Sequence, residues 1–135
     1  MLIRDLLTLK QLNLPVKIVV FNNSSLAFIE LEMKAAGILD FATDLHNLNF
    51  AEVAKAIGLF GARVESPEDL GGALKDAFAH DGPGLIDVVT NRQELSMPPN
   101  IELKQALGFS LYMARAVLNG RGDELIDLAK TNLFR

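Results

Sequence analysis

Apolar and polar residues follow two kinds of pattern along this chain, one with helical spacing and one apolar at nearly every position. Leucines recur at close to the helical period of about 3.6 residues between positions 2 and 12, which predicts a helix over residues 1–13. Pro15 ends that helix, because the residue before a proline is pushed out of helical geometry. Residues 16–22 are apolar at nearly every position, which predicts a parallel strand covered on both faces.

The same reading predicts that strands and helices alternate as far as residue 90. Further helices are expected over residues 26–36, 49–57 and 66–80, and further strands over 60–65 and 85–90. Asn49 and Ser66 are residue types that cap helix starts, while Gly37 and Gly58 are suited to helix ends. This order predicts an α/β fold with a parallel sheet flanked by helices. Three strands make a thin sheet, so we expect it to be incomplete.

The helix expected at residues 26–36 has apolar residues at helical spacing on one side. These are Leu26, Ile29, Met33 and Ala36.

The pattern changes after residue 92. Residues 93–100 contain Met97-Pro98-Pro99 and read as a linker, and amphipathic helices follow over 101–118 and 123–132. We therefore expect two parts, residues 1–92 and residues 93–135. Most amphipathic helices face a core, so packing on its own domain is one interpretation of the tail. Lipid binding is the other, and it would depend on apolar burial, because residues 121–135 carry three basic and three acidic residues.

Composition removes several classes of function. The chain has 135 residues, half of them hydrophobic, and no cysteine, so disulfide frameworks and thiolate metal sites are excluded. Its net charge is −4 and it has no basic stripe, so we expect no nucleic-acid partner. No apolar run approaches the roughly 20 residues that a membrane-spanning helix needs.

The candidate chemistry lies where the strand at residues 16–22 ends. Asn22, Asn23, Ser24 and Ser25 follow the apolar run, and a helix begins at about Leu26. Mg²⁺ prefers oxygen ligands, and the amides at a helix start favour phosphate groups. The alternative is that these residues only cap the helix, as Asn and Ser commonly do.

Residues 14–24 resemble the second half of the cofactor motif of thiamine diphosphate-dependent enzymes, in which a Gly-Asp-Gly precedes an Asn-Asn pair. The resemblance implies the later part of a thiamine diphosphate-binding domain. It implies Mg²⁺ ligation by Asn23 and by the backbone carbonyl of Ser25. The implied cofactor-binding residues are Asn23, Ser24, Ser25, Leu26, Ala27, Phe28 and Ile29. The Gly-Asp-Gly, with its metal-binding carboxylate, is absent from this sequence.

The resemblance extends to the membrane-activated pyruvate oxidases, also called pyruvate dehydrogenases (quinone), through Asp81-Gly82-Pro83, residues 108–113 and residues 120–124. It implies oxidative decarboxylation of pyruvate to acetate and CO₂, with electrons passing through FAD to ubiquinone. It also implies a homotetramer that is cytoplasmic and peripheral on the inner face of the cell membrane. Residues 109–135 would bind lipid and inhibit the resting enzyme, and Phe28 would move into the site on activation. This chain alone is expected to be inactive.

Three alternatives stay open. The chain is a non-catalytic lipid-associating module, or it belongs to a sibling thiamine diphosphate-dependent decarboxylase or acetolactate synthase. A sibling would share Asn22-Asn23 but not the tail. Phe28, read without the resemblance, is a core residue of its helix.

Overall fold

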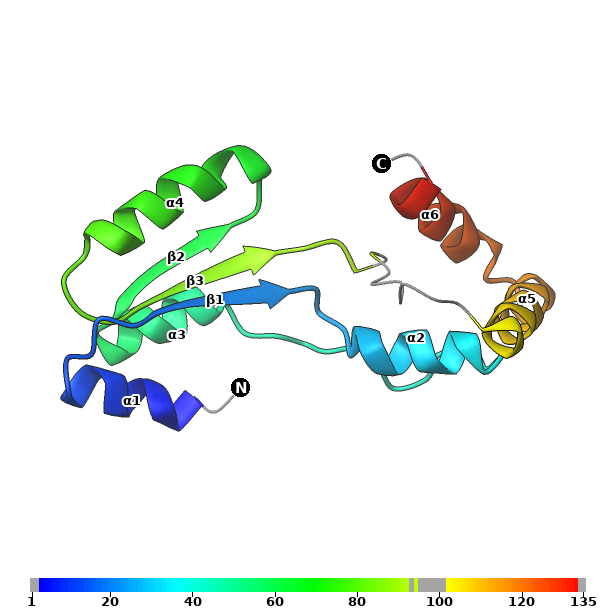
Figure 1. Ribbon diagram of the computed structural model, residues 1–135, viewed down its shortest axis with the longest axis horizontal. Helices are drawn as coiled ribbons and strands as arrows, with labels where there is room; N and C mark the ends of the chain where they lie inside the picture. The colour runs from blue at the N-terminus through cyan, green and yellow to red at the C-terminus, as the bar shows by residue number, and fades with distance from the viewer. Residues whose placement is uncertain (1–2, 93, 95–101, 134–135) are drawn as a thin grey trace. The chain divides into compact units, whose positions relative to one another are not determined.

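Three parallel strands form one sheet in the computed structural model, as the alternation of strands and helices predicts. The structure describes residues 3–92, 94 and 102–133. The strands are β1 (Lys17–Asn22), β2 (Phe60–Val64) and β3 (Gly84–Val89). Their order across the sheet is β1-β3-β2, so the last strand in the chain lies between the other two (Figure 1).

The chain groups into two units by its contacts. Unit 1 comprises residues 1–23 and 46–90, and unit 2 comprises residues 24–45 and 91–135. Residues 24–45 therefore group with the C-terminal helices rather than with the sheet. The division expected from the sequence, 1–92 and 93–135, has other bounds and stays a prediction.

Helices cover both faces of the sheet in unit 1. The helices α1 (Ile3–Gln11) and α3 (Phe50–Ile57) lie on one face, and α4 (Pro67–Ala79) lies on the other (Figure 1). The first face is closed by a cluster of buried residues, Leu6, Ala54, Leu59 and Leu85. The second is closed by Val64, Ala77, Ile86 and Val88. The alternating faces of β3 contribute to both clusters, which makes β3 the strand that is covered on both sides.

The expectation that β1 is covered on both faces is wrong within this chain. Ile18 and Val20 pack on the cluster beneath α1 and α3, but Val19 is exposed and Phe21 is 75 % exposed. The reason is topological, since β1 is an edge strand and α4 packs over β2 and β3. The apolar run that reads as a doubly covered strand therefore has only one covered face.

The helix boundaries in unit 1 follow the capping residues. The Asn49 side chain accepts a hydrogen bond from the Glu52 backbone N–H at 3.1 Å, and Gly58 ends α3 with a φ of 84°. Pro67 is the first residue of α4, where its missing N–H costs nothing. Ser66 makes no side-chain cap, and its hydroxyl donates to Glu68 instead.

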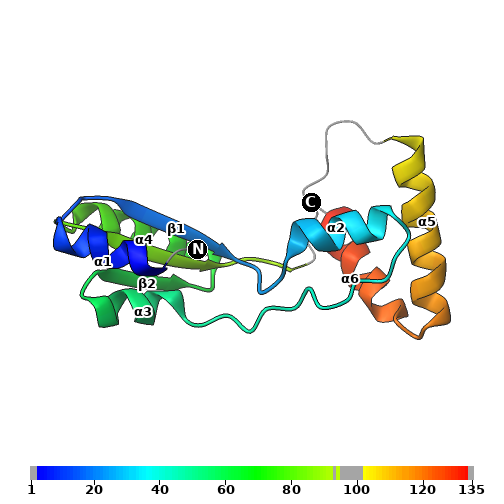
Figure 2. The same ribbon diagram turned by 90° about the horizontal axis from the view of Figure 1, so that it is seen from below.

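Unit 2 contains the helices α2 (Ala27–Ala35), α5 (Leu103–Leu118) and α6 (Gly122–Leu133). The C-terminal end of α2 meets α5 (Figure 2), and the backbones approach so closely that a Cβ on Gly108 would lie 1.9 Å from the Ala35 carbonyl oxygen. Gly37 ends α2 with a φ of 76°, and the amides of Gly37 and Ile38 bond back to the last turn. Arg115 of α5 donates to the Gly37 carbonyl at 2.5 Å.

The buried side of α2 is charged and not apolar. Leu26 and Ile29 are exposed, whereas Glu30 and Lys34 are buried, with Lys34 only 2 % exposed. The two buried charges pair with each other, which removes the penalty that excludes single charges from protein interiors. Hydrophobic spacing alone does not reveal such a pair.

The C-terminal helices lie close to their expected bounds. Helix α6 begins at Gly122, one residue before the expected start, so Asp123 lies in its first turn. The linker expected at residues 93–100 lies outside the described residues, apart from Glu94. Among the described helices, none combines the length and apolar character needed to cross a bilayer.

Candidate functional site

The carboxyl end of β1 in unit 1 carries the first residues of the expected motif. Asn22 is the last residue of the strand and is 5 % exposed. Its Nδ2 donates to Asp87 Oδ1 at 3.0 Å, and its Oδ1 accepts from Asn47 Nδ2 at 2.8 Å. Both ends of this amide are therefore engaged within the protein. Asn22 is therefore a structural residue of the sheet edge.

Asp87 is the centre of this arrangement. It lies on β3, the central strand, and is fully buried. Besides Asn22, it accepts from the Phe50 backbone N–H at 3.1 Å and from Arg63 Nη1 at 2.7 Å. One carboxylate thus joins β1, β2 and the start of α3 to the central strand. Sequence reasoning missed Asp87, because its partners come together only through strand pairing.

Asn23 follows β1 directly and is half-buried. Its backbone continues from a residue that two side-chain hydrogen bonds fix in place. The hydrogen bonds of Asn22 therefore fix the backbone position from which Asn23, the expected metal ligand, extends. The role of Asn23 itself stays a prediction.

The remaining expected site residues lie in unit 2, at the start of α2. Ser24 has a positive φ of 55°, and its carbonyl accepts from the Leu45 N–H at 2.9 Å. Ser25 forms an isolated antiparallel bridge with Asp44, and the Leu26 N–H donates to the Thr43 carbonyl at 2.9 Å. Backbone bonds to residues 43–45 therefore fix the entry to the helix.

The first turn of α2 is suited to an anion. Leu26 is the N-cap residue and has no side-chain oxygen, so it cannot satisfy the amides of Ala27, Phe28 and Ile29. Such amides, together with the dipole of the helix, favour phosphate oxygens. By type, one asparagine amide oxygen, one backbone carbonyl and a helix start match what a Mg²⁺-bound diphosphate requires. The residues present therefore fit the group that the motif implies.

The Ser25 hydroxyl takes no part in such a set, because it donates to Glu30 Oε2 at 2.7 Å. Only the backbone carbonyl of Ser25 is proposed as a ligand, and that role stays a prediction. Phe28 is 73 % exposed, so the structure does not support its alternative as a core residue. Within the described part of the chain, no cluster of three or more His, Cys, Asp or Glu side chains is arranged to hold a metal.

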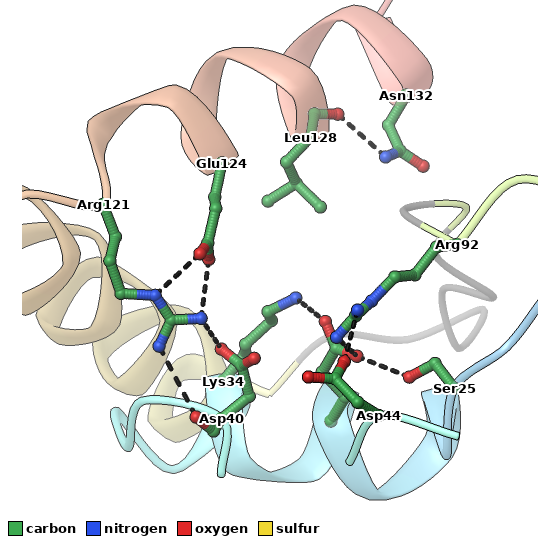
Figure 3. A network of polar contacts seen from close by, with 10 residues as sticks. Ser25, Lys34, Asp40, Asp44, Arg92, Arg121, Glu124, Leu128 and Asn132 are labelled. Carbon is green, nitrogen blue, oxygen red and sulfur yellow. Dashed lines mark hydrogen bonds and ion pairs between the residues drawn. The ribbon is translucent and has the colours of Figure 1, made fainter. Parts of the chain in front are cut away.

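Figure 3 shows a polar network within unit 2, which has the buried side chains of Glu30 and Lys34 on α2 at its centre. Glu30 accepts from Ser25 and, at 2.5 Å, from Lys34 Nζ, and Arg92 Nη2 lies 3.6 Å from it. Lys34 also lies over the Tyr112 ring, 5.6 Å from its centroid. Arg92 pairs in addition with Asp44. The spacing of Glu30 and Lys34, four residues apart on a helix, was a readable signal for this pair.

A second ion pair in unit 2 joins the loop after α2 to the start of α6. Arg121 donates to Asp40 Oδ1 at 2.8 Å and pairs with Glu124 at 2.7 Å (Figure 3). Burial by itself raises the pKa of Asp40, but the hydrogen bond and charge of Arg121 outweigh it and lower the pKa below its ordinary value. Burial raises the pKa of Tyr112 to about 12, so its hydroxyl stays neutral at physiological pH.

The expected site residues are thus divided between the units. Asn23 ends the first segment of unit 1, and Ser24 begins unit 2. Each side has a local structure that suits its expected role.

One relative of this chain carries the cofactor in its name, and two others are named acetolactate synthases. A Bacillus subtilis (strain 168) protein, named as a proposed thiamine pyrophosphate-containing protein, YdaP, is 34 % identical over 131 residues, which cover 97 % of this chain and 23 % of the relative. The mitochondrial acetolactate synthase of Schizosaccharomyces pombe is 30 % identical over 70 % of this chain and 14 % of its own length. The acetolactate synthase of Bacillus subtilis is 30 % identical over 62 % of this chain and 15 % of its own.

The chain therefore spans less than a quarter of the length of these relatives. A family model described as the thiamine pyrophosphate enzyme, C-terminal TPP binding domain, matches residues 1–88. Since that match covers well over half of its residues, the chain belongs to the thiamine pyrophosphate enzymes, in their C-terminal cofactor-binding domain.

Proposed function

We propose that this chain holds the Mg²⁺–diphosphate end of thiamine diphosphate in an enzyme that acts on a 2-oxo acid, with pyruvate as the substrate and acetolactate synthesis as the activity. The observation that carries this proposal is the end of β1, where a buried Asn22 fixes the backbone before Asn23 inside a matched cofactor-binding domain. The activity belongs to the whole enzyme, and we expect the 135-residue chain alone to be inactive.

The residues have separate parts in this proposal. Asn23 would give its side-chain oxygen to Mg²⁺, and Ser25 its backbone carbonyl. The first-turn amides of α2 would donate to the phosphate oxygens that the metal leaves free. When bound, thiamine diphosphate supplies the carbanion chemistry of decarboxylation, while the protein binds and orients it.

The choice of acetolactate synthesis rests on the named relatives. Acetolactate synthases from a yeast and a bacterium match 70 % and 62 % of this chain. This favours the sibling that the sequence left as an alternative over a pyruvate oxidase. In both candidates pyruvate loses CO₂, and they differ in what takes up the remaining two-carbon unit.

The second candidate is oxidation of pyruvate to acetate and CO₂ at the membrane, with FAD and ubiquinone as electron acceptors in a homotetramer on the inner face of the cell membrane. One observation favours it. Large apolar side chains along α5 are exposed, among them Leu111, Val117 and Leu118. An exposed apolar helix in residues 109–135 is the kind of surface that associates with lipid.

Product analysis separates the two candidates. The enzyme is supplied with Mg²⁺, thiamine diphosphate and pyruvate, and acetolactate is measured after acid converts it to acetoin. In a parallel reaction acetate and reduction of a quinone analogue are measured, with and without anionic phospholipid vesicles. The proposal expects acetolactate without any oxidant. Acetate formed only with the quinone analogue, and faster with vesicles, would instead establish the second candidate.

Asn23→Ala tests the site itself. We expect the Mg²⁺ requirement to rise by more than about tenfold, since losing even an indirect support of a metal ligand costs that much. Asn119→Ala is the matched control, because Asn119 is an exposed asparagine at the end of α5 whose side chain, among the contacts described, bonds only to the Arg115 carbonyl. An equal Mg²⁺ requirement in both variants would rule out Asn23 as a ligand.

A further inference from the structure

We propose that Asp87 is a positioning residue for the metal ligand, acting through Asn22. This inference rests on the proposed function, because it concerns the placement of Asn23 for Mg²⁺. Asp87 lies on the neighbouring strand, outside the motif that the family resemblance identifies, and touches neither Asn23 nor the start of α2 in any hydrogen bond described here.

The hydrogen bonds around Asp87 define one orientation of the Asn22 amide. A buried carboxylate only accepts, so Asn22 must turn its Nδ2 toward Asp87 Oδ1, at 3.0 Å. The Asn22 Oδ1 then faces outward from that bond and accepts from Asn47 at 2.8 Å. With both ends of its side chain fixed, the last residue of β1 has one position. Asn23 extends from that position.

The second carboxylate oxygen is held independently. Asp87 Oδ2 accepts from the Phe50 N–H at 3.1 Å and from Arg63 Nη1 at 2.7 Å. The carboxylate is therefore held at Oδ2 by the start of α3 and by β2, and at Oδ1 by Asn22. Loss of the Arg63 bond would leave the Phe50 N–H on Oδ2 and the Asn22 bond on Oδ1.

The stability of the sheet gives little reason to bury this charge. Burying a carboxylate is costly, and replacing a buried ion pair with apolar residues is often neutral or stabilising. Ile86 and Val88, its neighbours on β3, are apolar residues of the cluster under α4. A carboxylate at position 87 has a specific purpose if it holds Asn22, the residue before the proposed metal ligand Asn23.

The test compares variants that cut different bonds of the same carboxylate, in the enzyme as isolated. Asp87→Asn keeps the side-chain volume but places an NH₂ donor among three donors. Asn47→Ala removes only the outer bond to Asn22, from an exposed residue. Arg63→Gln is the control, because it removes the Arg63 ion pair with Asp87 Oδ2 and leaves the bond between Asp87 Oδ1 and Asn22 in place.

Two properties are measured for each variant. The first is the affinity for Mg²⁺ in the presence of thiamine diphosphate, by calorimetry. The second is the free energy of unfolding in urea. We expect Asp87→Asn to weaken Mg²⁺ binding by about 10- to 100-fold, the range seen when the partner of a metal ligand is lost, and Asn47→Ala to weaken it by less. Arg63→Gln should lower stability with Mg²⁺ affinity unchanged.

A structural readout that does not depend on activity accompanies the calorimetry. Without cofactor, the backbone amide signal of Asn23 in an NMR spectrum should shift in Asp87→Asn and Asn47→Ala but not in Arg63→Gln. Mg²⁺ affinity that falls in step with stability in all three variants, with an unmoved Asn23 signal, would reduce Asp87 to an ordinary buried residue and overturn the inference. Wild-type protein that binds no thiamine diphosphate would instead overturn the proposed function, and the inference with it.

Discussion

Individual residues in this protein show that burial and polarity are separate properties. Lys34 and Glu30 are among its most buried side chains, and Asp87 is fully enclosed. Each is tolerated because nearby groups supply hydrogen bonds and opposite charge. The consequence is that removing one partner leaves the other in a place that water does not reach.

The pair of Lys34 and Glu30 gives a direct prediction at this scale. Lys34→Met should lower the free energy of unfolding by about 3 kcal/mol, because it leaves Glu30 buried with only Arg92, 3.6 Å away, as a cation among the described contacts. Urea denaturation followed by circular dichroism measures the change.

Lys55→Ala is the matched control for this comparison. Lys55 pairs with Glu52 at 2.7 Å on α3, but both side chains are more than half exposed. Its loss should cost less than about 1 kcal/mol, as exposed pairs do. Similar losses in the two variants would contradict the role given to burial.

At the scale of the elements, close backbone contact determines which helices pack. Gly108 of α5 lies against the Ala35 carbonyl of α2, and Gly37 presents its backbone to Leu111. No larger residue fits at the first of these positions without moving a helix. The packing of α2 on α5 is the reason that residues 24–45 group with the C-terminal helices.

Gly108→Ala should therefore destabilise the protein by about 2 kcal/mol or more, since overpacking at a backbone contact cannot relax through a rotamer change. Gly72→Ala is the control. Gly72 lies in α4 with no atom near an added Cβ, so alanine should stabilise by roughly 0.5–1 kcal/mol through its helix propensity. Thermal denaturation measures both, and a neutral Gly108→Ala would show that α2 and α5 do not pack as described.

At the scale of the whole molecule, the cofactor motif is divided between two units. Unit 1 holds Asn22 and Asn23 at the end of β1, and unit 2 holds Ser24 and Ser25 before α2. A ligand that binds the folded chain but not the unfolded one stabilises the native state by mass action.

Thiamine diphosphate with Mg²⁺ should therefore raise the unfolding temperature of the enzyme. At about 100 times the dissociation constant the gain is about 2.7 kcal/mol, which corresponds to several degrees. Thiamine without its diphosphate is the matched ligand control and should give no Mg²⁺-dependent shift. Chelation of Mg²⁺ with EDTA should abolish the gain. A shift of equal size with thiamine alone would argue against a diphosphate site.

Much of the local structure could be predicted because short-range rules set it. Asn49 and Gly58 bound α3 as their capping chemistry predicts, and Pro67 begins α4. The strands after Pro15 and Pro83 have nearly their expected bounds. The resemblance of residues 14–24 to a cofactor motif predicted the thiamine diphosphate enzyme family, and the family match over residues 1–88 confirms it.

Local pattern did not determine which faces are covered, because contacts between distant residues decide this. The covered face of β1 depends on which strand lies beside it and where α4 packs. The buried face of α2 depends on an ion pair beneath Tyr112 of α5, which makes the apolar stripe of α2 the outer side. Neither contact leaves a trace in the spacing of hydrophobic residues.

The sequence by itself determined the strands, the helix ends and the amide-bearing turn after β1, because caps, turns and periodicity act over a few residues. Only the tertiary structure decided that Asp87 meets Asn22 and that Glu30 and Lys34 are buried. The physical reason is that a charged side chain is tolerated in a protein interior only where other groups pair with it. Those groups come from separate elements, so they are in contact only after the chain has folded.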